Sequence, residues 1–328
     1  MRCGRSILMK IAILGTGTIA RRFAAAMARV SGSEVSAVLS RDMERAEAFA
    51  REVGAARGCC DIEALLASGD VDAVYIGTPN NMHVPQALAV LRHGKPVLCE
   101  KPAFMCERDA REVISAAQDS NTLFMEAMWT RTMPGYQAAK RWLDEGRIGK
   151  LRSIYASFCF GSQYDPASRL YDPALGGGAL YDVGVYALAF ALDMAGARPD
   201  DVQGMLRMAP SGVDDHDAIN LRFGDIIATL HSSISVQQPG YACLYGDKGC
   251  IIMPEFWGAR HAELKDASGR VIDTFHEDMP DDLYHEAQHF IECCEHGLTQ
   301  SPLMPHEDSL YLAQLYDRLL RGDAALGA

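Results

Sequence analysis

The sequence predicts an α/β protein with a doubly wound parallel sheet, followed by an α+β domain with a large, mostly antiparallel open sheet. Strand-like and helix-like segments alternate up to about residue 127, which is typical of a parallel sheet with helices on both faces. From residue 202 to 275, strand-like runs follow one another without intervening helices, which favours antiparallel pairing. We therefore expect two domains, residues 1–127 and 128–328.

The first stretch that indicates a ligand is KIAILGTGTIA, residues 10–20. Its apolar run fits a buried parallel strand, and an amphipathic stretch follows the glycines at helical spacing. In G-x-G-x-x-A, Gly15 allows a tight turn, Gly17 lets a pyrophosphate approach the backbone, and Ala20 lets helix and strand pack closely. The free amides at the helix start favour phosphate. This context predicts a Rossmann dinucleotide-binding domain; the alternative is a glycine turn without ligand. The predicted cofactor contacts here are Gly15, Thr16, Gly17, Thr18 and Ile19.

The rest of the first domain supports a parallel sheet. Further strands are expected at 34–39, 71–76, 96–99 and 122–125, and helices at 41–53, 61–67, 83–93 and 107–118. Ligands of such sheets bind beyond the carboxyl ends of the strands. Small, polar or charged residues stand at all five ends, namely Gly15, Ser40, Thr78, Lys101 and Glu126.

The second domain is expected to begin with a helix at 136–145 and a strand at 151–160. A glycine-rich start then leads into a helix within residues 176–194. Strand-like runs follow at 218–223, 226–236 and 250–253, and two helices at 283–296 and 307–321 complete the domain.

Composition argues against several classes of function. A net charge of −12 without a long basic run disfavours nucleic-acid and anionic-membrane partners. The ten cysteines contain no C-x-x-C pair, so we expect no zinc site, and reduced thiols in a cytoplasmic protein. Residues 1–10 lack an apolar core of signal-peptide length, and no apolar run is expected to span a bilayer.

The end of the second strand indicates which dinucleotide binds. A carboxylate there is typical of NAD sites, but Ser40 ends this strand and Arg41 follows. Arg41 and Arg45 share one helix face, and two guanidinium groups suit the 2′-phosphate of NADP. We therefore favour NADP over NAD. Asp42 is a rival that could cap the helix or bind ribose, and a solvated charged face is the plainer alternative.

A lysine and a tyrosine form a candidate acid/base pair. Lys101 follows a strand that reads as buried, in E-K-P, and Tyr186 lies four residues after Asp182 in GGGALYDVGVY, residues 176–186. Free tyrosine has a pKa near 10. To act as an acid or base near neutral pH, a tyrosine needs its pKa lowered by roughly 3 units, which nearby cations can achieve. The alternatives are a surface lysine and a tyrosine that packs the domains together. Gly178 and Gly184 are costly in a helix and therefore predict close packing.

The sequence HEAQH, residues 285–289, spells the zinc-protease motif H-E-x-x-H. Leu283, Ala287 and Phe290 mark the apolar face of the expected helix, so His285 and His289 are expected to face solvent. A catalytic zinc also needs a third ligand, for which only Glu307 is a downstream candidate. We expect no metal.

Five motifs together resemble one family. GTGTIA at 15–20, TPNNMH at 78–83 and EKP at 100–102 look like the glucose–fructose oxidoreductase/inositol dehydrogenase (Gfo/Idh/MocA) family. MEAMWTR at 125–131 and GGGALYDVGVY resemble its branch of dimeric trans-dihydrodiol dehydrogenases and NADP-dependent D-xylose dehydrogenases. Most of the family has histidine at the position of Tyr186, whereas this branch has a tyrosine taken as the acid/base.

The resemblance assigns roles to individual residues. It implies that Lys101 assists Tyr186, that Asp182 orients the substrate hydroxyl, and that Arg41 and Arg45 bind the 2′-phosphate. Trp129 and Arg131 would border the cofactor and substrate pocket, with Phe160 and Trp257 as aromatic walls. The further expected cofactor contacts are Ser40, Thr78, Pro79, Asn80, His83, Glu100, Lys101 and Arg131.

We therefore expect a cytoplasmic NADP-dependent oxidoreductase that acts on a secondary alcohol of a sugar, polyol or cyclic trans-diol. By resemblance it is a homodimer through its C-terminal sheet. An NAD-dependent inositol or sugar dehydrogenase and a keto-sugar reductase are alternatives of the same family. A dinucleotide-sensing regulator without turnover is the alternative of another class, although retention of both Lys101 and Tyr186 argues against it.

Overall fold

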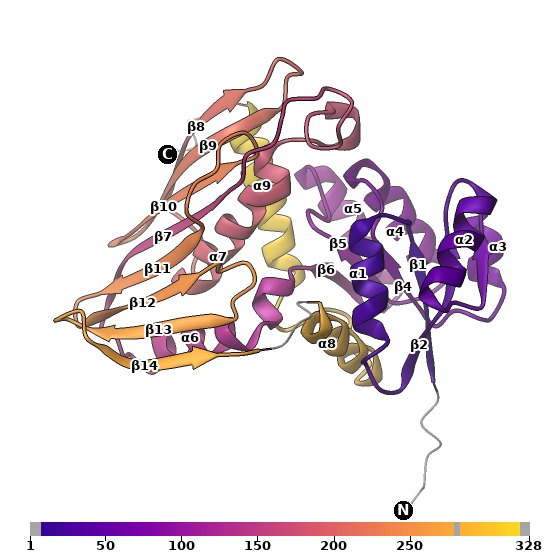
Figure 1. Ribbon diagram of the computed structural model, residues 1–328, viewed down its shortest axis with the longest axis horizontal. Coiled ribbons are helices and arrows are strands. Elements are labelled where there is room, and N and C mark those ends of the chain that lie inside the picture. The colour runs from indigo at the N-terminus through magenta and orange to yellow at the C-terminus, as the bar shows by residue number, and fades with distance from the viewer. Residues whose placement is uncertain (1–7, 279–282, 322–328) are drawn as a thin grey trace, which may run out of the picture. The chain divides into compact units, whose positions relative to one another are not determined.

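Six parallel strands form the sheet of the N-terminal half, in the order β3-β2-β1-β4-β5-β6 (Figure 1). This order is that of the doubly wound dinucleotide-binding fold, with its switch point between β1 and β4. The computed structural model describes residues 8–278 and 283–321. The strands are β1 (Met9–Leu14), β2 (Ser33–Leu39), β3 (Arg57–Cys59), β4 (Ala73–Ile76), β5 (Val97–Glu100) and β6 (Phe124–Ala127).

Some helices of this unit begin or end at capping residues that the sequence supplies. Asp61 accepts hydrogen bonds from the backbone N of Glu63 and Ala64, at 2.9 and 3.1 Å, as expected of an N-cap. Gly54 ends its helix in the left-handed conformation. The helices are α1 (Thr18–Met27), α2 (Met43–Val53), α3 (Ile62–Ala67), the 3₁₀ turn η1 (Asn80–Met82), α4 (His83–Arg92), α5 (Glu107–Asp119) and α8 (Tyr284–Glu295).

The chain divides into two units whose limits differ from one cut at residue 127. Residues 281–309, expected in the second domain, group with the first. Within the described part of that segment, α8 packs on α1, because Ala287, Phe290 and Ile291 form a buried stripe. Of the described residues, 105–107, 128–278 and 310–321 form the second unit.

The second unit is built on an eight-stranded sheet in the order β14-β13-β12-β11-β7-β10-β9-β8 (Figure 1). All neighbours are antiparallel except β7 and β10, which confirms the mostly antiparallel sheet. The strands are β7 (Leu151–Cys159), β8 (Asp201–Met208), β9 (Asp214–Phe223), β10 (Ile226–Ser233), β11 (Tyr241–Gly246), β12 (Gly249–Pro254), β13 (His261–Asp266) and β14 (Val271–His276).

Two helices cover one face of this sheet: α6 packs on β13, and α7 packs on β7 and β10. α9 starts in the first unit and ends in the second. The helical elements are η2 (Trp129–Thr132), α6 (Pro134–Asp144), η3 (Pro173–Leu175), the π-helical turn η4 (Leu180–Gly184), α7 (Val185–Ala195) and α9 (His306–Arg321).

One apolar helix has the length and composition of a membrane span but is buried. Among the described residues, the helical stretch Pro173–Ala195 is long and apolar enough to cross a membrane. However, 83% of its most apolar window is buried inside the protein, because α7 is apolar on nearly all sides and lies against the sheet. A helix that is hydrophobic all round is typical of a protein core as well as of a membrane.

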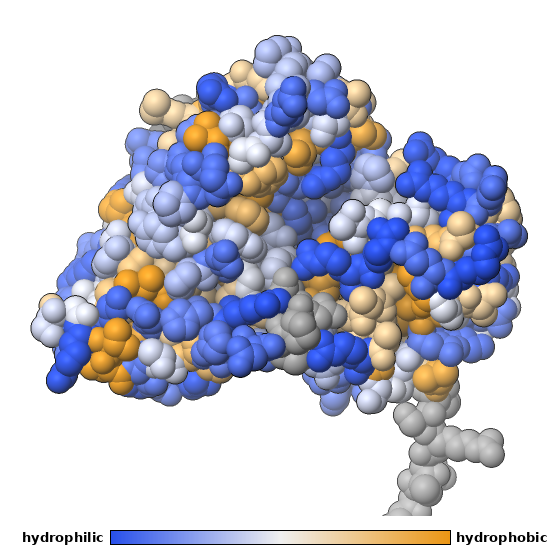
Figure 2. Space-filling model, viewed as in Figure 1, coloured by the Kyte–Doolittle hydropathy of each residue, from blue (hydrophilic) through white to orange (hydrophobic). Residues whose placement is uncertain are grey.

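The other face of the sheet carries exposed apolar side chains. Met205 on β8 and Ile227 on β10 are 79% and 46% exposed, while Ala228 and Leu230 alternate with Ile227 toward the covered face. Figure 2 shows hydrophobic groups as separate small patches among hydrophilic ones on the surface in view.

Candidate active site

The glycine turn of the first unit has the shape that a dinucleotide needs. Gly15 has a φ of +108°, and a Cβ there would lie 2.6 Å from the carbonyl oxygen of Gly77. A Cβ on Gly17 would meet nothing within 4 Å, so space is open above the turn. Ala20 is fully buried, as close helix–strand packing requires. No acidic residue lies in the first turn of α1, and no side chain caps it, so its free amides suit an anion.

Two arginines follow the end of β2, and the carboxylate of the aspartate between them is hydrogen-bonded to the backbone of α2. Asp42 caps α2 by accepting a hydrogen bond from the backbone N of Arg45 at 2.7 Å. The capping alternative for Asp42 is therefore confirmed. Arg41 and Arg45 are exposed, and no side-chain partner of either lies within residues 8–278 and 283–321. Both guanidinium groups are thus available to a phosphate.

The loop after β4 is held together from inside by His83. Its ring is fully buried and lies 2.9 Å from two backbone carbonyl oxygens, of Pro102 through Nδ1 and of Thr78 through Nε2. Burial lowers the pKa of His83. Both ring nitrogens of His83 therefore already face protein groups. His83 ties the turn after β4 to the turn after β5, and Thr78 Oγ1 donates to Gln86 at 2.7 Å.

At the end of β5, Glu100 turns inward and Lys101 is half-buried. The Tyr75 hydroxyl donates to Glu100 Oε1 at 2.7 Å, and the Lys101 backbone N lies 3.3 Å from Oε2. Glu100 is 6% exposed, and burial raises its pKa. Its carboxyl group therefore braces the turn that carries Lys101.

In the second unit, the glycine-rich stretch starts a helix in an unexpected form. Residues 180–184 form a π-helical turn before α7, so the α-helical spacing assumed between Asp182 and Tyr186 does not apply. The predicted close packing of the glycines is confirmed. A Cβ on Gly178 would lie 2.4 Å from Asp214 Oδ1, and one on Gly184 would lie 3.0 Å from Ser232 Oγ.

Tyr186 lies in an aromatic cluster. Trp129 Nε1 donates a hydrogen bond to Tyr186 Oη at 2.7 Å, and the two rings meet edge to face. Phe158 lies 5.4 Å from the Tyr186 ring and stacks on Trp257 at 3.7 Å. Trp129 and Trp257, chosen from the sequence, therefore gather with Tyr186.

Phe158 joins this cluster, whereas Phe160 was the aromatic wall expected from the resemblance. Phe160 lies beyond the end of β7 and packs with Tyr171, Val183 and Ile234 in a separate core cluster, which Phe158 also borders. Strand alternation leaves the two phenylalanines on one face, so it did not separate them. The sequence did not show that β7 ends before Phe160.

Two charged residues of the site already have protein partners. Asp182 Oδ1 receives a hydrogen bond from Arg169 Nη1 at 2.9 Å, with the aspartate side chain 15% exposed. Arg131 is 2% exposed and donates to the carbonyl oxygen of Ala189 in α7 at 3.0 Å. Arg131 therefore braces η2 against α7.

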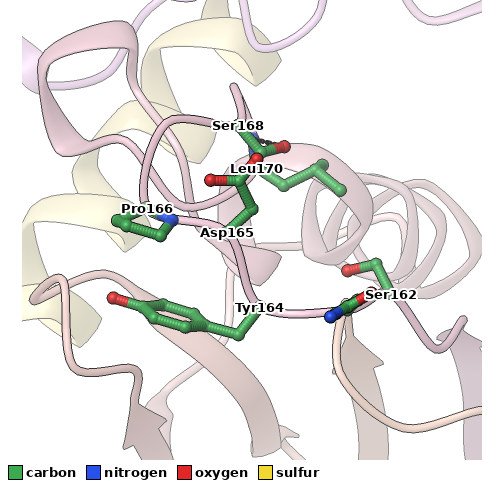
Figure 3. Close-up of a pocket in the computed structure, with 7 residues that line it drawn as sticks. Ser162, Tyr164, Asp165, Pro166, Ser168 and Leu170 are labelled. Carbon is green, nitrogen blue, oxygen red and sulfur yellow. Dashed lines mark hydrogen bonds between the residues drawn. The ribbon is translucent and has the colours of Figure 1, made fainter.

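Arg169 belongs to a loop that forms a pocket of about 520 Å³ in the second unit. Figure 3 shows the Tyr164 and Pro166 rings in this loop, with Asp165 and Ser168 above them. The lining residues are Ser162, Gln163, Tyr164, Asp165, Pro166, Ser168 and Leu170.

The H-E-x-x-H stretch of α8 has no metal-site geometry. His289 does not face solvent as expected; its Nε2 lies 2.8 Å from Ser301 Oγ, and burial lowers its pKa. His285 is also half-buried, and Glu286 is fully buried. Over the described ranges 8–278 and 283–321, no group of three or more His, Cys, Asp or Glu residues could hold a metal ion.

Comparison with protein families gives two matches along the chain. The model described as "Oxidoreductase family, NAD-binding Rossmann fold" matches residues 9–128, and the "GFO/IDH/MocA C-terminal domain" matches residues 136–252.

Curated relatives span almost the whole chain. A scyllo-inositol 2-dehydrogenase (NADP(+)), IolU of Bacillus subtilis (strain 168), is 33% identical, covering 94% of this chain and 95% of the relative. A trans-1,2-dihydrobenzene-1,2-diol dehydrogenase of Xenopus laevis is 32% identical, covering 95% and 97%.

Solved structures have the same fold. The 3-ketoreductase KijD10 of Actinomadura kijaniata, in complex with NADP and TDP-benzene, superposes with a TM-score of 0.85 at 27% identity, covering 96% of this chain and 98% of that one. A levoglucosan dehydrogenase in complex with NADH and levoglucosan has a TM-score of 0.87 at 20% identity, covering 96% of this chain and 97% of that one. At this identity the similarity shows the fold alone.

Proposed function

The chain belongs to the Gfo/Idh/MocA oxidoreductase family, and from this premise we propose that it is an NADP-dependent enzyme acting on a secondary alcohol. Its family and relatives support an NAD(P)-dependent oxidoreductase of sugars, polyols or diols. The observation that carries the more specific proposal is the exposed Arg41 and Arg45 beside a carboxylate, Asp42, that already caps α2.

The residues of the first unit fit a dinucleotide with a 2′-phosphate. Gly17 leaves space for a pyrophosphate at the free amides of α1. Two guanidinium groups can surround a phosphate, whereas Asp42 already accepts a hydrogen bond from the helix backbone through Oδ1. The nicotinamide ring, when bound, accepts or supplies the hydride.

We assign the proton transfer to Tyr186. In the direction of oxidation, its Oη takes the proton of the substrate hydroxyl, and in reduction it returns that proton. The N–H of Trp129 points at this oxygen and stabilises negative charge on it. We propose Lys101 as the cation that keeps the proton affinity of Tyr186 near the working pH.

Asp182 is proposed to orient the substrate hydroxyl. Its carboxylate is mostly buried, and Arg169 compensates its charge. The aromatic cluster around Tyr186 supplies apolar surface of the kind that packs on a sugar ring or a cyclic diol. We therefore propose sugars, polyols and trans-diols as the substrate class.

Two further activities use the same groups. A keto-sugar reductase needs Tyr186 as an acid instead of a base, and KijD10 is described as a 3-ketoreductase. An NAD-dependent dehydrogenase would not need Arg41 and Arg45. A dinucleotide sensor without turnover would bind the cofactor and leave every polyol unchanged.

We propose a cytoplasmic homodimer in which the uncovered face of the large sheet is the interface. Exposed Met205 and Ile227 lie on that face, and apolar groups of this kind are buried on association. Sedimentation equilibrium of the wild type and of Ile227→Asp tests this: a dimer that dissociates in the variant supports the interface, and a monomeric wild type contradicts it.

Titration with NADPH and with NADH, followed by nicotinamide fluorescence, tests the cofactor proposal. Tight binding of NADPH with weak binding of NADH is the expected result. A preference for NADH would overturn the NADP assignment, and binding of neither would contradict an enzyme of this class. Turnover is then measured with NADP and D-xylose, scyllo-inositol and trans-dihydrodiols, because any turnover excludes the sensor.

A further inference from the structure

Three aspartates in the sequence VDDHD lie near the start of the helix that carries Asp182 and Tyr186. Asp214, Asp215 and Asp217 are 1%, 7% and 0% exposed. Asp215 forms an ion pair with Arg207 at 2.8 and 3.0 Å. Asp214 and Asp217 have no such cationic partner within the described residues, so their burial needs another explanation.

A β-bulge places Asp214 and Asp217 on the same face of β9. Side chains three residues apart on a regular strand point to opposite faces. Here Arg207 pairs with His216 and Met208 pairs with Asp214, so Asp215 is the extra residue and the alternation shifts by one. Both carboxyl groups therefore point toward η4, which packs on β9 and β10.

Asp214 receives a backbone hydrogen bond at the start of this helix. The backbone N–H of Leu180 donates to Asp214 Oδ2 at 2.5 Å. Gly178, with a φ of +129°, lies so close that a Cβ would be 2.4 Å from Asp214 Oδ1. The first free amide of η4 is thus satisfied by a side chain of the sheet, as helix starts require.

Asp217 shares this face of β9 with Asp214. Its Oδ2 accepts a hydrogen bond from Ser232 Oγ at 2.8 Å, and its carboxyl group is close enough to that of Asp214 for the two to interact. Asp217 Oδ1 is buried and receives no donor from the described residues. Carboxylates offer only acceptors, so a hydrogen bond between these two side chains requires one proton.

We propose that Asp214 and Asp217 share one proton and together fix the start of the helix that bears Asp182 and Tyr186. Asp214 is then a positioning residue, and its part in catalysis rests on the function proposed above for Tyr186. Asp217 holds the proton and donates it to Asp214, whose other oxygen anchors the amide of Leu180.

The surroundings of the pair agree with a retained proton. Burial, followed by the charge of Asp214, raises the pKa of Asp217 to about 9. Among the groups around it, Asp215 on the same strand raises this pKa, Ser232 on β10 lowers it, and the Cys159 thiol on β7 is close enough to be affected by Asp217. Burial raises the pKa of Asp214 as well, but the backbone N–H of Leu180 opposes this rise by stabilising its carboxylate, which favours the proton on Asp217.

The proton is tested on the apoprotein, independently of turnover. Infrared spectra of protein labelled with carbon-13 at the aspartate carboxyl separate aspartic acid from the buried glutamic acids. We expect a protonated aspartate at neutral pH that disappears around pH 9 and is absent from Asp217→Asn. A wild type without protonated aspartate at neutral pH would overturn the shared proton.

Positioning is tested by hydrogen exchange and by kcat. Asp214→Ala should accelerate amide exchange over residues 178–186 and lower kcat about 10- to 100-fold, with KM for NADPH unchanged. Asp214→Asn and Asp217→Asn keep hydrogen-bonding groups in place and should retain most of kcat at neutral pH. Asp215→Asn, on the same strand, is the control that should leave exchange over 178–186 as in the wild type.

The possible failures are distinguishable. If the wild type turns over no substrate, the proposed function fails, while exchange in Asp214→Ala still decides whether Asp214 fixes the helix. Unchanged exchange over 178–186 in a folded Asp214→Ala protein would overturn the positioning role. If Asp214→Ala does not fold, amide exchange over 178–186 is measured in Asp214→Leu instead. The kcat of Asp214→Asn, which should be retained, is then compared with the kcat of Asp214→Leu.

Discussion

The indole N–H of Trp129 donates to the phenolic oxygen of Tyr186 across 2.7 Å, and the two side chains are 7% and 6% exposed. An N–H donor at this oxygen stabilises the phenolate more than the phenol. The oxygen proposed to exchange a proton with the substrate therefore has a fixed, nearly dry hydrogen-bond partner, which is typical of a preorganised catalytic group.

Trp129→Phe removes this donor while keeping an aromatic ring. We expect kcat to fall about tenfold, since hydrogen bonds to charged groups contribute about 1.5 kcal/mol or more. In the oxidation direction, the pH at which kcat reaches half of its plateau should move upward, because the phenolate is less stable. The pH dependence of kcat measures this. Trp142→Phe, in α6, is the control, and an unchanged profile in Trp129→Phe would remove the indole from the mechanism.

Arg41→Ala and Arg45→Ala should each weaken NADPH binding about 10- to 100-fold and leave NADH binding nearly unchanged. Each change removes a charged hydrogen-bond donor from the expected 2′-phosphate, which NADH lacks. Fluorescence titration with both cofactors measures the effect. Arg51→Ala removes an exposed arginine farther along α2 and should alter neither affinity. Equal losses for NADPH and NADH would contradict the 2′-phosphate assignment.

Lys101 and Tyr186 should behave as one unit in a double-mutant cycle. If Lys101 acts only through Tyr186, the double variant Lys101→Met/Tyr186→Phe should have nearly the kcat of the poorer single variant. Multiplicative losses would mean independent roles. Lys95→Met, at the opposite end of β5, is the matched control, because its Nζ donates to the carbonyl oxygen of Val71 outside the site.

The buried Glu286 predicts a pH dependence of stability. Its two carboxyl oxygens receive no hydrogen bond within the described ranges, and burial raises its pKa well above 4.5. The folded protein therefore keeps a proton that the unfolded chain releases above about pH 4.5, so the free energy of unfolding falls as pH rises from there.

Glu286→Gln cannot ionise and should lose this part of the pH dependence. The Tm of Glu286→Gln minus the Tm of the wild type should be more positive at about pH 8 than at about pH 5, because only the wild type loses stability as pH rises. Thermal unfolding at both values measures it. Glu295→Gln, exposed on the same helix, should show no such change. An equal difference at the two pH values would contradict a buried, protonated Glu286.

The sequence was most informative where local chemistry decides the structure. The turn at Gly15 and the helix starts at Asp61 and Asp42 follow from short patterns with one physical solution. The arginines after β2 were found because a carboxylate was missing from its usual place. These features depend on neighbours in the chain and on few distant contacts.

The sequence was less informative where distant segments meet. His83 and Glu100 follow motifs of a ligand site but turn inward, because Thr78, Pro102 and Tyr75 offer them partners. No local sequence pattern marks the bulge at Asp215, so the sequence did not predict that Asp214 and Asp217 lie on the same face of β9. The π-helical turn at 180–184 likewise reflects packing of η4 on the sheet.

The most direct test of the proposed mechanism is the kcat of Tyr186→Phe with saturating NADP and a substrate that the wild type oxidises. The account predicts a loss of about 100- to 10,000-fold, the usual contribution of general acid–base catalysis, with NADPH affinity nearly unchanged. Tyr181→Phe, on the same helical stretch, should retain kcat. Normal turnover by Tyr186→Phe would contradict the assignment of the proton transfer to this residue.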